Sequence, residues 1–209
     1  MTEATLAIVV CGPQLEVALR IPSQEVASLV RLAGVSPRST LLLAAADLLV
    51  EDAGLEPSDI ERVVVSRGPG SFTGVRAGIA SAQGLAAATG AQLIAFDSLL
   101  VQASRCGGVP SVRAAQPGRR GEVYARAFEL HPGLPPGALG EIEIRRVDSL
   151  GGDGLWIGPD TLDLGDAERA SPLRSAAESL LLLDAAGAEP QPLKPLYVEG
   201  PPIHGAARK

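Results

Sequence analysis

The sequence has little lysine, and this scarcity bears on its possible partners. Lysine occurs only at Lys194 and Lys209, and the formal net charge is −6, from 24 acidic and 18 basic residues. Proteins dedicated to nucleic-acid binding owe much of their affinity to clustered Lys and Arg. The charge balance therefore argues against that class, although it is compatible with a subunit of an RNA-processing complex. The scattered Arg residues are interpreted as solvated or salt-bridged.

Cysteine and histidine are equally scarce, with two of each. Cys11 and Cys106 stand far apart and match no CxxC spacing, so we expect two reduced thiols. His131 and His204 form no HxxxH or HExxH pair. No metal site is therefore expected, and both histidines are interpreted as solvated loop residues.

Several signatures of enzymes and of targeting are also missing. Ser71 is not the serine of a GxSxG motif, because Pro69 takes the place of the first glycine, and no Gly-Lys-Ser/Thr loop occurs. The segment Met1–Ala4 lacks the basic region of a signal peptide, and the apolar runs are too interrupted to cross a membrane. We expect a cytoplasmic protein without an active site of its own and without a cofactor.

What is present is enough apolar material for a well-packed α/β protein. The chain has 209 residues, of which 46% are hydrophobic, and this length fits one large domain or two small lobes. In the first half, β-branched runs alternate with helical patterns. Strands are expected at Thr5–Cys11, Leu15–Arg20, Glu25–Leu32, Ile60–Ser66 and Gln92–Phe96, and helices at Ser36–Ala53, Thr73–Ala88 and Ser98–Ser104.

The order β-β-β-α-β-α-β-α fits a ribonuclease-H-like lobe, although periodicity alone supports only the α/β class. From Gly107 onward, Pro and Gly become dense. We therefore expect an N-terminal lobe over residues 1–106 and a smaller lobe over 107–209, with the tail from about 190 packing back on the first lobe. Strands of the second lobe are expected at Val109–Ala115, Glu122–Leu130, Glu141–Val147 and Leu155–Ile157, followed by a helix that begins at Ser171-Pro172 and runs to Gly187.

The segment from Ser66 to Arg76 is the most informative motif. Gly-Pro-Gly after a strand predicts a tight turn, and Ser71 or Thr73 can cap the helix that follows. The exposed N–H groups of such a helix start are able to hold an anion, but a strand-to-helix corner without a ligand explains the sequence equally well. The residues of this corner are Gly68, Pro69, Gly70, Ser71, Phe72, Thr73 and Arg76.

The helix after this corner is rich in small residues, and the helix Ser36–Ala53 is apolar around most of its circumference. Interior glycines destabilise a helix by about 0.5–1 kcal/mol each, so their retention indicates that another backbone comes close. That backbone belongs either to the same chain or to a partner. The candidate interface residues on the two helices are Leu41, Leu42, Ala45, Leu48, Leu49, Gly74, Ala77, Gly78, Ser81 and Ala82.

The stretch from Ser66 to Leu99, SRGPGSFTGVRAGIASAQGLAAATGAQLIAFDSL, resembles the signature of the TsaB family, also known as YeaZ-like or inactive glycoprotease-like proteins. The resemblance extends more loosely to Arg119–Tyr124, Gly152–Gly154 and Pro195–Val198. It implies a two-lobed, actin-like (ASKHA) fold. It also implies a non-catalytic subunit that pairs through its N-lobe helices with a TsaD-like catalytic subunit, joined by a TsaE-like ATPase.

Together, such proteins add threonylcarbamoyl to the adenosine beside the tRNA anticodon, so the resemblance implies that this chain meets tRNA only indirectly. Two departures from the family pattern stand out. The first strand reads Ile8-Val9-Val10-Cys11 where the family has Ile-Asp-Thr-Ser, and Pro117-Gly118 replace an Asp before Arg119. An actin-like ATPase uses a carboxylate at the first hairpin to organise metal and phosphates.

The missing carboxylate argues against the alternative function, an actin-like nucleotide-binding enzyme that uses the Gly68–Thr73 corner for phosphate. A third possibility is a protein that self-associates through the same helices. The sequence therefore allows a homodimer when the chain is isolated.

Overall fold

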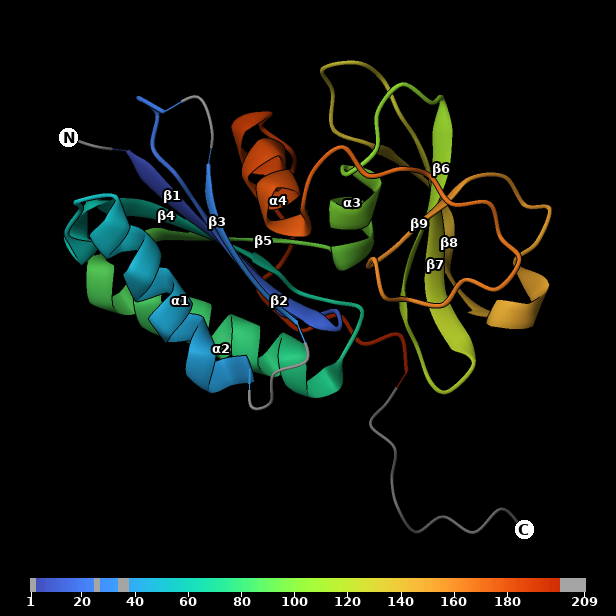
Figure 1. Ribbon diagram of the computed structural model, residues 1–209, viewed down its shortest axis with the longest axis horizontal. Coiled ribbons are helices and arrows are strands. Elements are labelled where there is room, and N and C mark those ends of the chain that lie inside the picture. Colours follow the sequence, from blue (N-terminus) through green and yellow to red (C-terminus); the bar gives the residue numbers. More distant parts are fainter. Residues whose placement is uncertain (1–2, 25–26, 34–37, 200–209) are drawn as a thin grey trace, which may run out of the picture.

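The computed structural model describes residues 3–24, 27–33 and 38–199, which form two β-sheets with helices packed around them (Figure 1). The first sheet has the order β3-β2-β1-β4-β5. Strands β1, β2 and β3 pair antiparallel, whereas β1, β4 and β5 run parallel. Its strands are β1 (Ala4–Val9), β2 (Gln14–Arg20), β3 (Ser28–Ala33), β4 (Ile60–Ser66) and β5 (Gln92–Phe96).

Helices cover both faces of this sheet. Helices α1 (Arg38–Asp52) and α2 (Phe72–Thr89) pack on one face, and α4 (Ala176–Ala185) packs on the other (Figure 1). Successive side chains of a strand point to opposite faces, and β1 follows this rule. Leu6 and Ile8 join the core under α1 and α2, whereas Ala7 and Val9 join the core under α4. This double burial explains why every position of β1 is buried and why Thr5 is its one polar residue.

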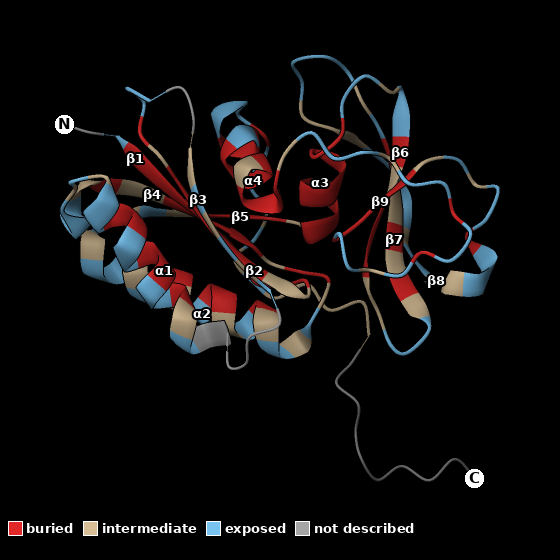
Figure 2. Cartoon of the chain, viewed as in Figure 1, coloured by how far each residue is buried: buried red, intermediate tan, exposed pale blue. Residues whose placement is uncertain are grey.

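The second sheet has the order β8-β7-β6-β9. Helix α3 (Ser98–Ala103) links the two sheets, because it follows β5 and packs on β6 and β7. Most of α3 is buried (Figure 2). The strands of this sheet are β6 (Ser111–Pro117), β7 (Glu122–Glu129), β8 (Gly137–Arg146) and β9 (Trp156–Ile157), and short 3-10 turns lie at Pro57–Asp59 and Val147–Ser149. None of the helices in the described part of the chain has the length and hydropathy to cross a bilayer.

The expected elements are present, and several of their ends differ from the predicted bounds by a few residues. The predicted start at Ser171-Pro172 is wrong, because α4 begins at Ala176. Ser175 caps it: its hydroxyl accepts from the Glu178 amide, and the Glu178 carboxylate accepts from the Ser175 amide. Strand β8 begins at Gly137, ahead of the predicted start at Glu141. The predicted helix start at Ser36 and Pro37 lies outside the described residues.

Helix α3 also differs from the expectation at its first turn. Its N-cap is Asp97, and the Ser98 hydroxyl instead accepts a hydrogen bond from the Gly68 amide. The tail was expected to pack back on the first lobe from about residue 190. The chain returns to the first sheet earlier, with α4. The division into lobes at residue 106 stays a prediction, but the polypeptide near 176–199 packs with the N-terminal sheet.

A buried arginine joins α3 to the segment after β9. The Arg105 side chain is only 3% exposed. It donates to the Gln102 side chain, to the Gly158 and Arg174 carbonyls, and to the Asp160 carboxylate at 2.6 Å. Partial burial opposes ionisation of Asp160, but the Arg105 guanidinium holds the pKa of that carboxyl below its usual value.

Replacing Arg105 tests how much its contacts between α3 and the segment after β9 stabilise the protein. Arg105→Met leaves several buried acceptors without a donor, so we expect it to lower the free energy of unfolding by about 3 kcal/mol. Urea denaturation followed by circular dichroism measures the change. The control is Arg146→Met, at an exposed pair with Asp148, which should leave the denaturation midpoint unchanged. Equal midpoints for both variants would contradict the role given to Arg105.

Candidate functional site

The Ser66–Arg76 corner sits where β4 passes into α2, directly above the end of β1. A Cβ on Gly70 would overlap the Cys11 carbonyl, so only glycine fits there. The Ser71 amide donates to the same Cys11 carbonyl at 2.8 Å, and the Ser71 hydroxyl caps the helix by accepting from the Gly74 amide at 3.2 Å. The amides of Ser71 and Gly74 are therefore already hydrogen-bonded within the chain. This argues against the alternative in which the start of the helix binds an anion.

Beneath the corner, Cys11 is fully buried. Its sulfur lies 3.0 Å from the Ser66 hydroxyl. Burial raises the pKa of the Cys11 thiol, so the group is neutral at physiological pH. Cys11 and Cys106 are both free, as expected. Cys11 packs with Val75 and Ile79 of α2 and therefore has a structural role at this corner.

The side chains of the corner hold the C-terminal tail. Arg67 pairs with Asp97 at 2.6 Å, and its backbone carbonyl accepts from the Leu196 amide. Phe72 stacks on Tyr197 with ring centroids 4.9 Å apart. Arg76 lies over the Phe72 ring at 4.2 Å and donates to the Tyr197 hydroxyl at 2.9 Å. The family motif is thus largely explained by contacts within the chain.

A cleft of about 480 Å³ lies between this corner, the first hairpin and the β6–β7 turn. In the described part of the chain, Glu199 is the only carboxylate that lines it. Glu199 pairs with Arg119 at 3.1 Å and accepts from the Tyr124 hydroxyl at 3.2 Å. Burial, together with this carboxylate, raises the pKa of Tyr124. The tail therefore ties the corner to the second sheet across the cleft.

The candidate interface residues divide into a buried group and a group that is partly or fully exposed. The first group lies in the chain's own core and is unavailable to a partner: Leu42, Ala45, Leu49, Gly78 and Ala82. The second group is partly or fully exposed: Leu41, Leu48, Gly74, Ala77 and Ser81. The close backbone approach expected for the helical glycines occurs within the chain, because a Cβ on Gly74 would overlap the Val10 carbonyl.

The outward side of α1 and α2 exposes two large apolar side chains, next to the exposed acidic residues Asp47 and Glu51 of α1. Leu43 is 51% exposed and Leu48 is 56% exposed. On α2, Ala80, Gly84 and Ala88 are exposed at intervals of four residues and therefore line one side of the helix. The outward-facing residues of both helices lie together on one side of the molecule (Figure 2). We refer to Leu43, Leu48, Ala80, Gly84 and Ala88 as the outer face.

A shallow groove of about 300 Å³ lies beside this outer face, between the two helices and the turn at Pro57. Leu43, Asp47 and Leu85 are among its walls. Sequence reasoning missed Leu43 and Gly84. Each of these residues lies on the same side of its helix as an exposed residue one turn away, so the sequence spacing did group them with exposed neighbours. The spacing does not show which side of a helix faces solvent, because that depends on how the helix packs on the sheet.

Polar groups elsewhere are mostly engaged. Arg145 pairs with Asp153 at 2.6 Å, and Arg146 pairs with Asp148 at 2.9 Å, which agrees with the salt-bridged interpretation of the arginines. Among the described residues, His, Cys, Asp and Glu form no group of three or more that could hold a metal ion.

Comparison with known proteins places this geometry in a family. The family model for TsaD, tRNA N6-adenosine threonylcarbamoyltransferase, matches residues 24–133, which is more than half of the chain. The chain belongs to this family, as a TsaB-type member. It is 42% identical over 120 residues to the tRNA threonylcarbamoyladenosine biosynthesis protein TsaB of Escherichia coli, a match that covers 53% of this chain and 52% of that protein.

A second relative is TsaB of Bacillus subtilis, 33% identical over 100 residues, covering 46% of this chain and 42% of that protein. The matches thus span about half the length of these curated relatives. Two structures of YeaZ or a YeaZ-like protein from Pseudomonas aeruginosa superpose with a TM-score of 0.76 at 24% and 25% identity, covering 94% of this chain and 100% of those chains. The TsaB-type chain therefore has the actin-like, ribonuclease-H-like fold that its sequence predicts.

The contact between corner and tail is testable. Tyr197→Ala removes the stack on Phe72 and the hydrogen bond from Arg76, so we expect amides 192–199 to exchange with deuterium about 10-fold faster. Mass spectrometry of exchanged peptides measures the rate. Lys194→Ala is a matched control, because the Lys194 side chain is exposed and only its carbonyl contacts Arg67. Unchanged exchange in Tyr197→Ala would show that the corner does not hold the tail.

Proposed function

We propose that this chain is a non-catalytic subunit in the synthesis of threonylcarbamoyladenosine in tRNA. The TsaB relatives are named for threonylcarbamoyladenosine biosynthesis, which supports this role, as does the chain's membership of the family named for the transferase TsaD. In this proposal the chain acts in the cytoplasm and binds a TsaD-like catalytic subunit. A TsaE-like ATPase joins the complex, and tRNA is met only through it.

The observation that carries the proposal is the outer face of α1 and α2. Two leucines of α1 that are more than half exposed, and a stripe of small residues on α2, give these helices apolar surface that an isolated chain would leave in water, although Asp47 and Glu51 are exposed there too. Small residues at intervals of four let a second helix approach closely, and the leucines fill the space between helices. This surface fits a helix pair from a partner of the same fold.

A homodimer through the same face is the competing arrangement when the partner is absent. The chain's net charge of −6 keeps the monomer soluble, whereas the apolar face favours association. In the proposal, the catalytic subunit displaces any such homodimer because both use the same helices.

Two substitutions on the outer face test the partner interface. Leu48→Glu places a charge in the apolar contact, and Gly84→Leu adds bulk where no atom of this chain lies within 4 Å of a Cβ. We expect each to weaken binding to the organism's TsaD-like protein at least tenfold, roughly the effect of losing a central interface contact. Calorimetric titration of the purified proteins measures the affinity.

The control is Leu139→Glu, at another exposed leucine on the edge strand β8, which should bind like the wild type. Circular dichroism must show that all three variants fold. Wild-type affinity in both Leu48→Glu and Gly84→Leu would exclude this face as the interface.

A further inference from the structure

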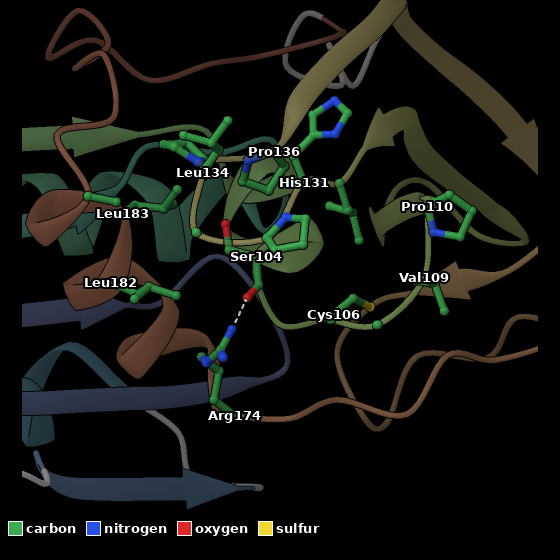
Figure 3. A pocket seen from close by; sticks show the side chains of 17 residues that line it. Ser104, Cys106, Val109, Pro110, His131, Leu134, Pro136, Arg174, Leu182 and Leu183 are labelled. Atoms are coloured by element: carbon green, nitrogen blue, oxygen red, sulfur yellow. Dashed lines mark hydrogen bonds between the residues drawn. The ribbon is translucent and has the colours of Figure 1, made fainter.

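A second concave site lies on the opposite side of the first sheet from α1 and α2. It is a pocket of about 510 Å³ between the C-terminal half of α4, the segment 104–110 and the loop 130–136 (Figure 3). Its walls are mainly apolar and include Val109, Leu130, Leu134, Leu182 and Leu183. The volume lies within the range of about 300–1,000 Å³ typical of small-molecule sites.

The floor of the pocket is uncharged. Cys106 lies there and is only 8% exposed. Burial raises the pKa of its thiol to about 11, although Arg105 and Arg174 act in the opposite direction. The thiol is therefore neutral at physiological pH, so the floor presents sulfur and carbon to any occupant.

Arg174 is the exception to this apolar lining. It is half-buried, and one guanidinium nitrogen donates to the Ser104 carbonyl at 2.6 Å (Figure 3). Its charge helps to lower the pKa of Glu178, yet among the described residues no carboxylate lies within 4.0 Å of its guanidinium. Arg62, Arg67, Arg105 and Arg145 have such a partner. Four half-buried arginines among the described residues lack one, namely Arg20, Arg113, Arg126 and Arg174, and of these Arg174 is the one that lines this pocket.

A partly desolvated cation without an anion is costly, and a carboxylate is its strongest partner, because the guanidinium offers paired N–H donors. The other basic group at the rim does not compete for this role, since His131 lies 3.6 Å from the Glu129 carboxylate. We propose that this pocket binds a small amphiphilic carboxylate, with its apolar body between α4 and the 130–136 loop and its carboxylate on Arg174.

The occupant is a small molecule because a stable protein partner needs an interface of roughly 1,000 Å² or more, whereas this site is a single open pocket of about 510 Å³. The site shares no residue with the outer face of α1 and α2, so it stands independently of the proposed function.

Decanoate, a ten-carbon carboxylate, is a suitable probe. Titration of the full chain below the micellar concentration, followed by calorimetry and by the methyl NMR signals of Leu134, Leu182 and Leu183, should show saturable one-to-one binding. Decan-1-ol, which has the same body without the charge, should bind about tenfold more weakly, because the charge-assisted hydrogen bond is lost. Acetate, which lacks the body, should not bind.

Two variants test the two parts of the site separately, namely the arginine that binds the carboxylate and the apolar walls that bind the rest of the molecule. Arg174→Gln should weaken decanoate binding about tenfold and leave decan-1-ol binding unchanged. Ala186→Trp, at an exposed position of the rim, should abolish binding of both by filling the pocket. Arg146→Gln is the control for the loss of a surface charge. Arg174→Lys, which keeps the charge, replaces Arg174→Gln if the latter fails to fold, and should retain more affinity for decanoate than for decan-1-ol.

The proposal fails if decanoate binds without saturation or at many sites, if decan-1-ol binds as tightly as decanoate, or if Ala186→Trp leaves decanoate binding unchanged. It also fails if no binding is detected at millimolar concentrations.

Discussion

The close approach of helix α2 to the carboxyl end of strand β1 is the contact on which the rest of the structure depends. The backbones of Gly70 and Gly74 lie against the carbonyls of Cys11 and Val10, where a Cβ has no room. This contact fixes both the position and the rotation of α2 on the sheet. The glycines of the corner are therefore explained by packing, even though they cost the helix some conformational entropy.

Once α2 is fixed, its two other surfaces follow. The first turn presents Phe72 and Arg76, which hold Tyr197 and so bring the tail back across the cleft. The far side presents Gly84 and its small neighbours to solvent. Helix α2 therefore has two roles. Its N-terminal end contacts the tail of the same chain, and the exposed side of the rest of the helix is a candidate surface for a partner. The pocket with Arg174 lies beyond the sheet, on elements that α2 does not touch.

Most of the fold was predictable from the sequence, because β1 and β4 are rich in β-branched residues and glycines follow α1, α2 and α4. The family motif also identified the corner. The helix cap at Ser175 was missed although its Ser-x-x-Glu pattern was visible, because the nearby Ser171-Pro172 gave a competing signal. The sequence did not separate the inward from the outward residues of α1 and α2, since α1 is apolar around most of its circumference and α2 is rich in small residues. Only the tertiary contact at Val10 decides that Gly78 points in and Gly84 points out.

The most direct test of the account is the threonylcarbamoyladenosine content of tRNA in cells of the source organism. Mass spectrometry of tRNA nucleosides should show that depletion of the chain lowers this modification. The wild-type chain and Leu139→Glu should restore it, whereas Gly84→Leu should not. Unchanged modification after depletion would contradict the proposed function. Full restoration by Gly84→Leu would contradict the assignment of the outer face to the catalytic subunit.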